Sequence, residues 1–220
     1  MTPKASILST RPLSQDVLDQ AAANDIEIEV ISFIRTEPLP YKGLPNSRNV
    51  VFTSVNAVEA VASIVKPRAV FCIGNSTAKL VTDQFGVDII KGTAESAAAL
   101  ADVIIQSGVK DVVFFCGDQR RGELPDKLAA NNIAVTEITV YRTIATPAKI
   151  KKDYTAILFF SPSAAESFFS ENKINGNTIL FAIGHTTATT IKKFSTNQVI
   201  IGEEPVKDAL ALKAIKHLVS

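Results

Sequence analysis

Several residue types are scarce in this chain of 220 residues, which has no tryptophan, one methionine, two cysteines and two histidines. Cys72 and Cys116 are far apart, lack C-x-x-C spacing and lie in apolar runs. This pattern predicts buried structural thiols in a reducing compartment rather than a disulfide or a redox pair. With so few cysteines and histidines and no clustered acidic motif, the sequence offers no credible set of metal ligands.

Excess charge of either sign is also missing, because 23 basic side chains face 22 acidic ones and the formal net charge is +1. A balanced chain argues against a broad surface for nucleic acid or for an anionic membrane. No apolar run approaches the roughly 20 residues that span a bilayer, and the N-terminus lacks the apolar core of a secretory signal. We therefore expect a cytoplasmic protein, whose hydrophobic content of 46% is enough for one large or two small domains.

Short apolar runs alternate with segments of helical pattern along the whole chain. Helical patterns of about 10 to 15 residues, such as SQDVLDQAAAN and NSTAKLVTDQF, separate most of these runs. This alternation predicts an α/β fold with largely parallel sheets. The expected strands are ASILS, IEIEV, NVVFT, AVFCI, VDII, DVVFFC, AVTEITV, AILFF, ILFAI and QVII.

The sequence also repeats itself. A shift of 107 positions places Asn24 on Asn131 and Ser54 on Ser161, and with three more residues inserted Gly74 falls on Gly184. Two copies of one unit account for nearly the whole chain, which predicts two similar α/β domains from a tandem duplication.

The boundary between the copies is not expected to be the boundary between the domains, because no proline- or glycine-rich break occurs near residue 107. Better linkers are the paired segments SFIRTEPLP and TVYRTIATP, which are extended and end in proline. The predicted domains are residues 38–141 and, as a discontinuous domain, residues 1–34 with 146–220. Residues 35–37 and 142–145 would form the connector strands.

Four expected strands end in a turn of small polar residues that begins a helix. Free N–H groups at such helix starts can hold an anion without a basic side chain, and in open parallel sheets these strand ends form the ligand crevice. Ordinary helix capping is the alternative, and the sequence leaves both open. The candidate binding residues in these turns are Ser54, Asn56, Gly74, Ser76, Thr77, Ser161, Ser163, Gly184, Thr186 and Thr187.

Other polar residues are weaker candidates. Arg11 follows the first strand, and Arg120 and Arg121 follow the corresponding strand of the second copy, where they could meet anionic groups or simply be solvated. His185 lies in a candidate turn but has no carboxylate or second histidine beside it. Neither G-x-G-x-x-G nor G-x-x-x-x-G-K-[ST] occurs, so nucleotide binding is poorly supported.

In order along the chain, STRP, VVFTSVNAVEAV, CIGNSTA, ITVYRT, ILFFSPSAAESFF and AIGHTTA resemble the uroporphyrinogen-III synthase family. The resemblance implies two α/β domains joined by two strands, with an active site in the cleft between them. It implies a hydro-lyase that cyclises hydroxymethylbilane, a linear tetrapyrrole with eight carboxylates, to uroporphyrinogen III through a spiro intermediate that inverts ring D. It implies no metal or organic cofactor, and we expect a monomer that could receive its substrate from the preceding enzyme of the pathway.

The resemblance also assigns roles to residues. The family's proposed general acid, a tyrosine, corresponds to Tyr141, and its cleft threonine corresponds to Thr187. A tyrosine packed at a strand end with its hydroxyl satisfied remains the alternative for Tyr141. A hinge-type binding protein for an anionic small molecule, or a transferase using a nucleotide sugar, are the rival functions.

Overall fold

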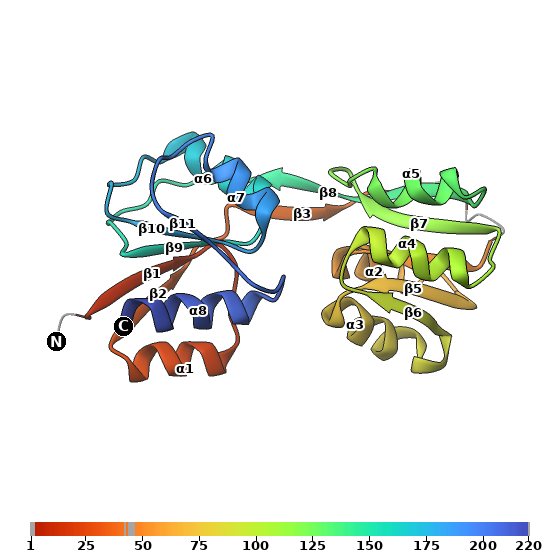
Figure 1. The fold of residues 1–220 in the computed structure, drawn as a ribbon, viewed down its shortest axis with the longest axis horizontal. Coiled ribbons are helices and arrows are strands. Elements are labelled where there is room, and N and C mark those ends of the chain that lie inside the picture. Colours follow the sequence, from red (N-terminus) through yellow and green to blue (C-terminus); the bar gives the residue numbers. More distant parts are fainter. Residues whose placement is uncertain (1–2, 42, 44–46, 220) are drawn as a thin grey trace. The chain divides into compact units, whose positions relative to one another are not determined.

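A computed structural model describes residues 3–41, 43 and 47–219. The chain forms two compact units (Figure 1). Unit 1 consists of Met1–Arg35 with Ile144–Ser220, and unit 2 consists of Thr36–Thr143. The chain passes from one unit to the other inside two strands, β3 (Ile34–Pro38) and β8 (Ala134–Ala145).

Unit 1 has a sheet in the order β11-β10-β9-β1-β2, in which all neighbouring strands are parallel. Helices α1 and α8 pack on one face around Ile7 and Leu158, and α6 and α7 pack on the other around Leu8 and Phe159. Its elements are β1 (Ala5–Ser9), α1 (Gln15–Ala23), β2 (Ile26–Val30), β9 (Ala156–Phe159), α6 (Pro162–Glu171), β10 (Ile179–Ala182), α7 (His185–Ile191), β11 (Val199–Ile201) and α8 (Lys207–Val219).

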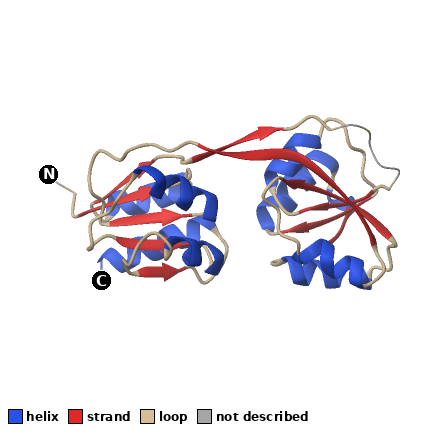
Figure 2. Ribbon diagram, turned by 90° about the horizontal axis from the view of Figure 1, so that it is seen from above, coloured by secondary structure: helices blue, strands red, loops and turns tan. Residues whose placement is uncertain are grey.

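Unit 2 has a sheet in the order β3-β8-β7-β4-β5-β6, and the strands from β8 to β6 pair in parallel. Helices α2 and α3 cover the face that carries Phe52 and Phe115, and α4 and α5 cover the face that carries Phe71 and Phe114. In Figure 2 helices flank the strands of each unit. The elements are β4 (Asn49–Phe52), α2 (Val55–Val61), β5 (Ala69–Ile73), α3 (Asn75–Phe85), the 3-10 helix η1 (Val87–Ile89), β6 (Ile90–Ala94), α4 (Ala97–Gln106), β7 (Asp111–Gly117) and α5 (Glu123–Ala130).

The two sheets confirm the predicted α/β class with parallel strands. The order β11-β10-β9-β1-β2 corresponds strand for strand to β6-β5-β4-β7-β8, as the sequence repeat requires. One difference is that β2 and β3 are separate strands, whereas the matching part of the second copy is the single strand β8. Phe33 lies at the break and is fully buried against Phe168, with ring centroids 5.1 Å apart.

One strand prediction is wrong. The run VDII does not form a strand, because Gly86 with φ +90° turns the chain into η1, and β6 begins only at Ile90. The strand continues through Gly92, where a Cβ would lie 2.3 Å from Val103 Cγ1 on α4. Local sequence rules treat such a glycine as a turn residue. The predicted strand was therefore placed before Gly92 instead of through it.

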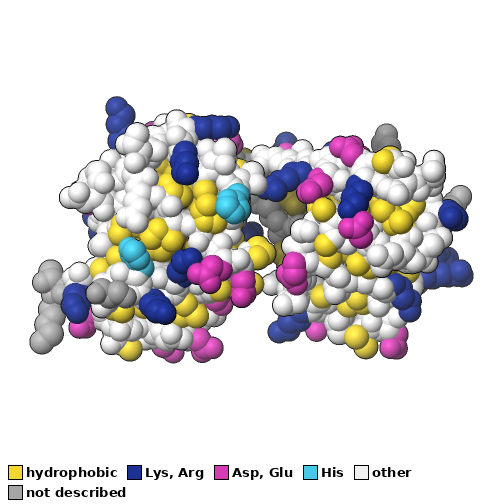
Figure 3. Space-filling view, viewed as in Figure 1, with side chains coloured by type: hydrophobic (Ala, Val, Ile, Leu, Met, Phe, Trp, Pro, Cys, Tyr) yellow, Lys and Arg dark blue, Asp and Glu magenta, His cyan; other side chains and the backbone are white. Residues whose placement is uncertain are grey.

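The surface agrees with the balanced composition. Basic and acidic side chains are interspersed over the visible faces of both units (Figure 3). Within the described ranges, no helix has the length and apolar character needed to cross a membrane.

Candidate active site

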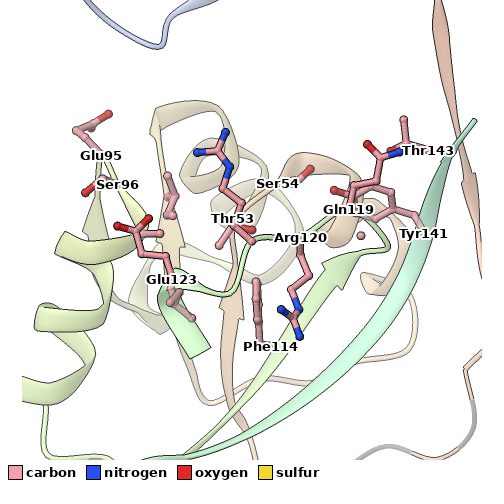
Figure 4. Close-up of a pocket in the computed structure, with 15 residues that line it drawn as sticks. Thr53, Ser54, Glu95, Ser96, Phe114, Gln119, Arg120, Glu123, Tyr141 and Thr143 are labelled. Carbon is pink, nitrogen blue, oxygen red and sulfur yellow. The ribbon is translucent and has the colours of Figure 1, made fainter. Parts of the chain in front are cut away.

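A cavity of about 440 Å³ in unit 2 lies at the carboxyl ends of strands β4, β5 and β7, beside strand β8. Thr53 and Ser54 follow β4, Ile73 ends β5, Gly117 ends β7, and Tyr141 lies on β8. Figure 4 shows Ser54, Gln119, Tyr141 and Thr143 together on one side of this cavity, with Glu95, Ser96 and Glu123 on the other. The remaining lining residues are Ala97, Phe114, Arg120, Arg121 and Leu124.

Ser54 and Tyr141 are predicted site residues that line this cavity, and the weaker candidates Arg120 and Arg121 line it too. Ser54 also caps α2, because its Oγ accepts a hydrogen bond from the Asn56 N–H at 3.2 Å. The capping role considered from the sequence is therefore real here, and it leaves the hydroxyl proton of Ser54 available to a ligand. Asn56 supplies the capped amide and is half-buried.

The two glycine turns begin their helices in different ways. Gly74 has φ +77°, a conformation that favours glycine, whereas Gly184 is extended with φ −173°. In neither turn does a side chain cap the first amides of α3 or α7. Because no described side chain caps them, those N–H groups can bind an anion.

The polar residues after these glycines occupy matching environments in both copies. Ser76 and Thr186 are exposed, whereas Thr77 and Thr187 are only 5% and 3% exposed. The exposed member of each pair is thus the better placed to contact a ligand.

Three further predicted residues lie in unit 1 and do not line this cavity. Ser161 Oγ accepts a hydrogen bond from the Ala164 N–H at 3.1 Å, which caps α6, and lies 3.3 Å from Ser163 Oγ. Arg11 is exposed, and its carbonyl accepts a hydrogen bond from Ser9 Oγ at 2.5 Å. Its guanidinium forms no ion pair with any described residue.

Charge around the cavity is mixed. Arg120 forms an ion pair with Glu137, with Nη2 2.8 Å from Oε1, which fixes its guanidinium on the β8 side. Arg121 is exposed, and its guanidinium pairs with no carboxylate in the described part of the chain. A cationic group that lacks an internal partner at a cavity mouth is suited to bind a carboxylate.

The remaining chemically reactive side chains are poorly suited to catalysis. Cys72 and Cys116 are buried free thiols, as predicted. Burial raises the pKa of Cys72 to about 11, and burial together with the charge of Glu137 raises the pKa of Cys116, so neither is an activated nucleophile. His185 is exposed at the start of α7. No three His, Cys, Asp or Glu side chains in the described residues could together hold a metal ion.

Sequence reasoning missed several residues of this cavity, notably Ser96, Gly117, Gln119 and Thr143. Ser96 was the easiest to find, since it lies just before α4 and caps this helix by accepting from the Ala99 N–H at 3.2 Å. The other three depend on how β7 and β8 pair, which no local pattern reveals.

A scan of family models matches residues 16–211 to the family described as Uroporphyrinogen-III synthase HemD. The chain belongs to the uroporphyrinogen-III synthase family. This is a family of hydro-lyases of tetrapyrrole biosynthesis, so the resemblance found in the sequence is confirmed, and with it the enzyme class.

Solved structures support the fold of this uroporphyrinogen-III synthase family member. The crystal structure of uroporphyrinogen-III synthetase from Helicobacter pylori matches with a TM-score of 0.70 and 16% identity, covering 97% of this chain and 99% of that one. A mutant uroporphyrinogen III synthase from the extremely thermophilic bacterium Thermus thermophilus matches with a TM-score of 0.60 and 12% identity, covering 97% and 98%. No sequence among the curated proteins gives a significant match.

Proposed function

We propose that this member of the uroporphyrinogen-III synthase family converts hydroxymethylbilane into uroporphyrinogen III, with loss of water and inversion of ring D. One observation carries the proposal: a tyrosine, an arginine that pairs with no described carboxylate and a helix-capping serine line a single cavity at the carboxyl edge of a parallel sheet. This cavity lies within the part of the chain that matches the family.

The reaction needs a proton where the hydroxyl of the substrate leaves. Tyr141 is the proposed donor, because its side chain is only half-buried in the cavity wall and its hydroxyl bonds to no described residue. Loss of water leaves an azafulvene cation, which the substituted α-carbon of ring D attacks to form a spiro-pyrrolenine. Cleavage of the bond between rings C and D then lets ring D reclose in the inverted sense, and a proton is lost to restore the pyrrole.

Control of shape is the main requirement, because direct closure of the same substrate gives the type I isomer. Holding the reacting ends in the productive geometry selects the product. We propose that substrate carboxylates are held by Arg121, Ser54 and the free amides after Gly74 in unit 2. The proposed donors in unit 1 are Arg11, Ser161, Ser163, Thr186, Thr187 and the amides after Gly184.

The deciding assay supplies hydroxymethylbilane generated enzymatically, oxidises the products and measures the ratio of type III to type I isomer. The proposal expects type III to dominate as the protein concentration rises. Type I as the sole product at high protein concentration would reject it in favour of a binding protein.

The role of Tyr141 is tested with Tyr141→Phe, which keeps the ring and removes the proton. We expect kcat to fall by about 100-fold, since general acid catalysis contributes about 10² to 10⁴, while KM changes little. Tyr41→Phe is the matched control, because Tyr41 is a tyrosine of the same unit whose buried hydroxyl has no partner among the described residues. Undiminished turnover of Tyr141→Phe would remove the acid role.

A further inference from the structure

The direction of the Tyr141 side chain does not follow from the alternation of β8. Ile138 and Val140 both pack into the cluster around Phe52 and Phe115, as alternate residues of a strand should. Tyr141, the next residue, would then point to the opposite face, yet it packs against the same cluster. The backbone at Tyr141 must therefore be rotated so that its side chain lies on the same face as that of Val140.

An irregularity in the pairing of β7 with β8 explains this turn. Cys116 pairs with Thr139, but Gly117 pairs with Tyr141, so Val140 has no partner on β7. An extra residue of this kind is a β-bulge, which places two successive side chains on one side of a strand and is frequent beside active sites. The bulge brings Tyr141 opposite Gly117.

Gly117 provides the space that the phenol occupies. A Cβ at this position would lie 2.5 Å from Tyr141 Cζ, 2.6 Å from Cε2 and 2.8 Å from the hydroxyl oxygen. Gly117 does not have a positive φ, so backbone conformation does not demand glycine here. What demands it is the ring of Tyr141.

Asp118 fixes the backbone of β8 directly after the tyrosine. The Asp118 N–H donates to the Tyr141 carbonyl at 3.1 Å, and Asp118 Oδ1 accepts from the Thr143 N–H at 3.0 Å. These two hydrogen bonds restrain the segment from Tyr141 to Thr143 against shifting along β7.

The sequence repeat supplies an independent indication that glycine and tyrosine belong together. At the positions that correspond to Gly117, Asp118 and Tyr141, the first copy carries Thr10, Arg11 and Ile34. Thr10 is fully buried, and its hydroxyl donates to the Leu158 carbonyl at 2.8 Å. Where the copy has no tyrosine, the space above the strand end is filled by a side chain.

We propose that Gly117 and Asp118 are positioning residues that set the place and direction of the Tyr141 hydroxyl in the cavity. The inference rests on the proposed function, because it acts on the same reaction through Tyr141. Gly117 has no side chain that would occupy the position of the Tyr141 ring. Asp118 stabilises the bulge that sets the direction of this ring. Neither residue needs to touch the substrate.

The first test follows Tyr141 directly and does not depend on activity. The chain has three tyrosines, so protein labelled with ¹³C in the tyrosine rings gives few signals, and Tyr141→Phe assigns that of Tyr141. We expect Gly117→Ala to shift this signal and to leave that of Tyr154, in the other unit, unchanged. An unmoved Tyr141 signal in Gly117→Ala would overturn the inference.

The second test is kinetic. Gly117→Ala should lower kcat by about 10- to 100-fold, the range expected for a displacement of about 1 Å, with KM little changed. In a Tyr141→Phe background the same substitution should cost no further kcat, because the hydroxyl it displaces is already gone. An equal loss in both backgrounds would show that Gly117 acts on something else and would overturn the inference.

Gly92→Ala is the matched control, since its methyl would also meet a side chain at less than 3 Å, that of Val103. It should lose stability without shifting the Tyr141 signal.

If Gly117→Ala does not fold, Asp118→Ala replaces it as the test variant. Asp118→Asn, which retains an acceptor for the Thr143 N–H, should restore kcat. If the wild-type protein forms only the type I isomer, the proposed function is rejected. If it forms type III product but the Tyr141 signal does not shift in Gly117→Ala, this inference alone is rejected.

Discussion

Units 1 and 2 share one strand order but differ at the ends of their equivalent strands, β1 and β7. In unit 1 the chain leaves β1 through Thr10, whose amide and hydroxyl both donate to the Leu158 carbonyl. In unit 2 it leaves β7 through Gly117, beside which the ring of Tyr141 lies at the wall of a cavity. The end of β1 is fixed by hydrogen bonds, whereas the end of β7 leaves space for an aromatic side chain.

This difference shows that two copies of a duplicated fold can keep the same core and differ at single strand ends. The core residues that build the sheets are equivalent in the two units, so both copies keep the layers that stabilise a domain. At the ends of β1 and β7, by contrast, the copies differ, with Thr10 in unit 1 and Gly117 in unit 2. The cavity beside Tyr141 therefore depends on a few strand-end positions of unit 2, while stability is distributed over both units.

The largest predicted effect concerns what the units share. Phe52 and Phe159 occupy equivalent positions of the repeat and are both fully buried. Phe52 lies near Phe85 and Phe115, and Phe159 near Phe168 and Phe169, with ring centroids 5.3 to 6.4 Å apart. Phe52→Ala and Phe159→Ala should each cost about 3 to 5 kcal/mol of unfolding free energy.

Urea unfolding, followed separately for each unit by hydrogen exchange, measures these costs. The control is Phe194→Ala, because Phe194 is 49% exposed and should cost much less than either buried ring. If one buried phenylalanine tolerated alanine while the other did not, the two cores would not be equivalent.

The shared features were predictable from the sequence for a physical reason. Buried parallel strands are short apolar runs, and helix starts need small polar caps, so the strands and the turns at Ser54 and Ser161 follow from local patterns. The repeat then related distant parts of the chain. The connector strands were predicted from a different local pattern, because the segments around Arg35 and Thr143 are β-branched and lead to proline.

The features that distinguish the copies were not predictable. The bulge opposite Gly117 depends on the register of β7 against β8, and register is a property of two segments together. Gly117 looked like an ordinary end of a strand, and Thr143 like part of a linker. Arg120 and Arg121 are adjacent in sequence, yet only the structure shows that Arg120 pairs with Glu137.

A smaller effect on stability is expected for the two capping serines. Ser161 Oγ accepts from the third amide of α6, that of Ala164, and Ser54 Oγ accepts from the second amide of α2, that of Asn56. Ser54→Ala and Ser161→Ala should each lower the unfolding free energy by about 1 kcal/mol. Thermal unfolding measures this loss.

Activity separates the two serines further. Ser54 also lines the cavity with Tyr141, so we expect Ser54→Ala to raise KM in addition to lowering stability. Ser54→Thr, which retains a hydroxyl, is the matched control. An unaltered KM for Ser54→Ala would reduce Ser54 to a helix cap.

The smallest predicted effect concerns a hydrogen bond that only unit 1 contains. Tyr154 Oη donates to Glu29 Oε2 at 2.6 Å. This bond, assisted by Lys152, lowers the pKa of the Glu29 carboxyl. The corresponding positions of unit 2 are Ser47 and Thr136, which cannot form such a pair.

The sign of the pH dependence follows from that shift. A carboxyl whose pKa is lower in the folded than in the unfolded state stabilises the protein above its unfolded pKa, and the contribution disappears as the pH falls through the folded pKa. Wild type should therefore exceed Tyr154→Phe in stability by more at pH 7 than at pH 3, because protonation of Glu29 removes the advantage. The gain is small, since the Glu29 side chain is 41% exposed. Tyr41→Phe is the control, because the Tyr41 hydroxyl has no hydrogen-bond partner in the described structure, and its difference from wild type should be the same at both pH values. If the difference between wild type and Tyr154→Phe were equally insensitive to pH, the bond to Glu29 would contribute nothing to the stability of unit 1.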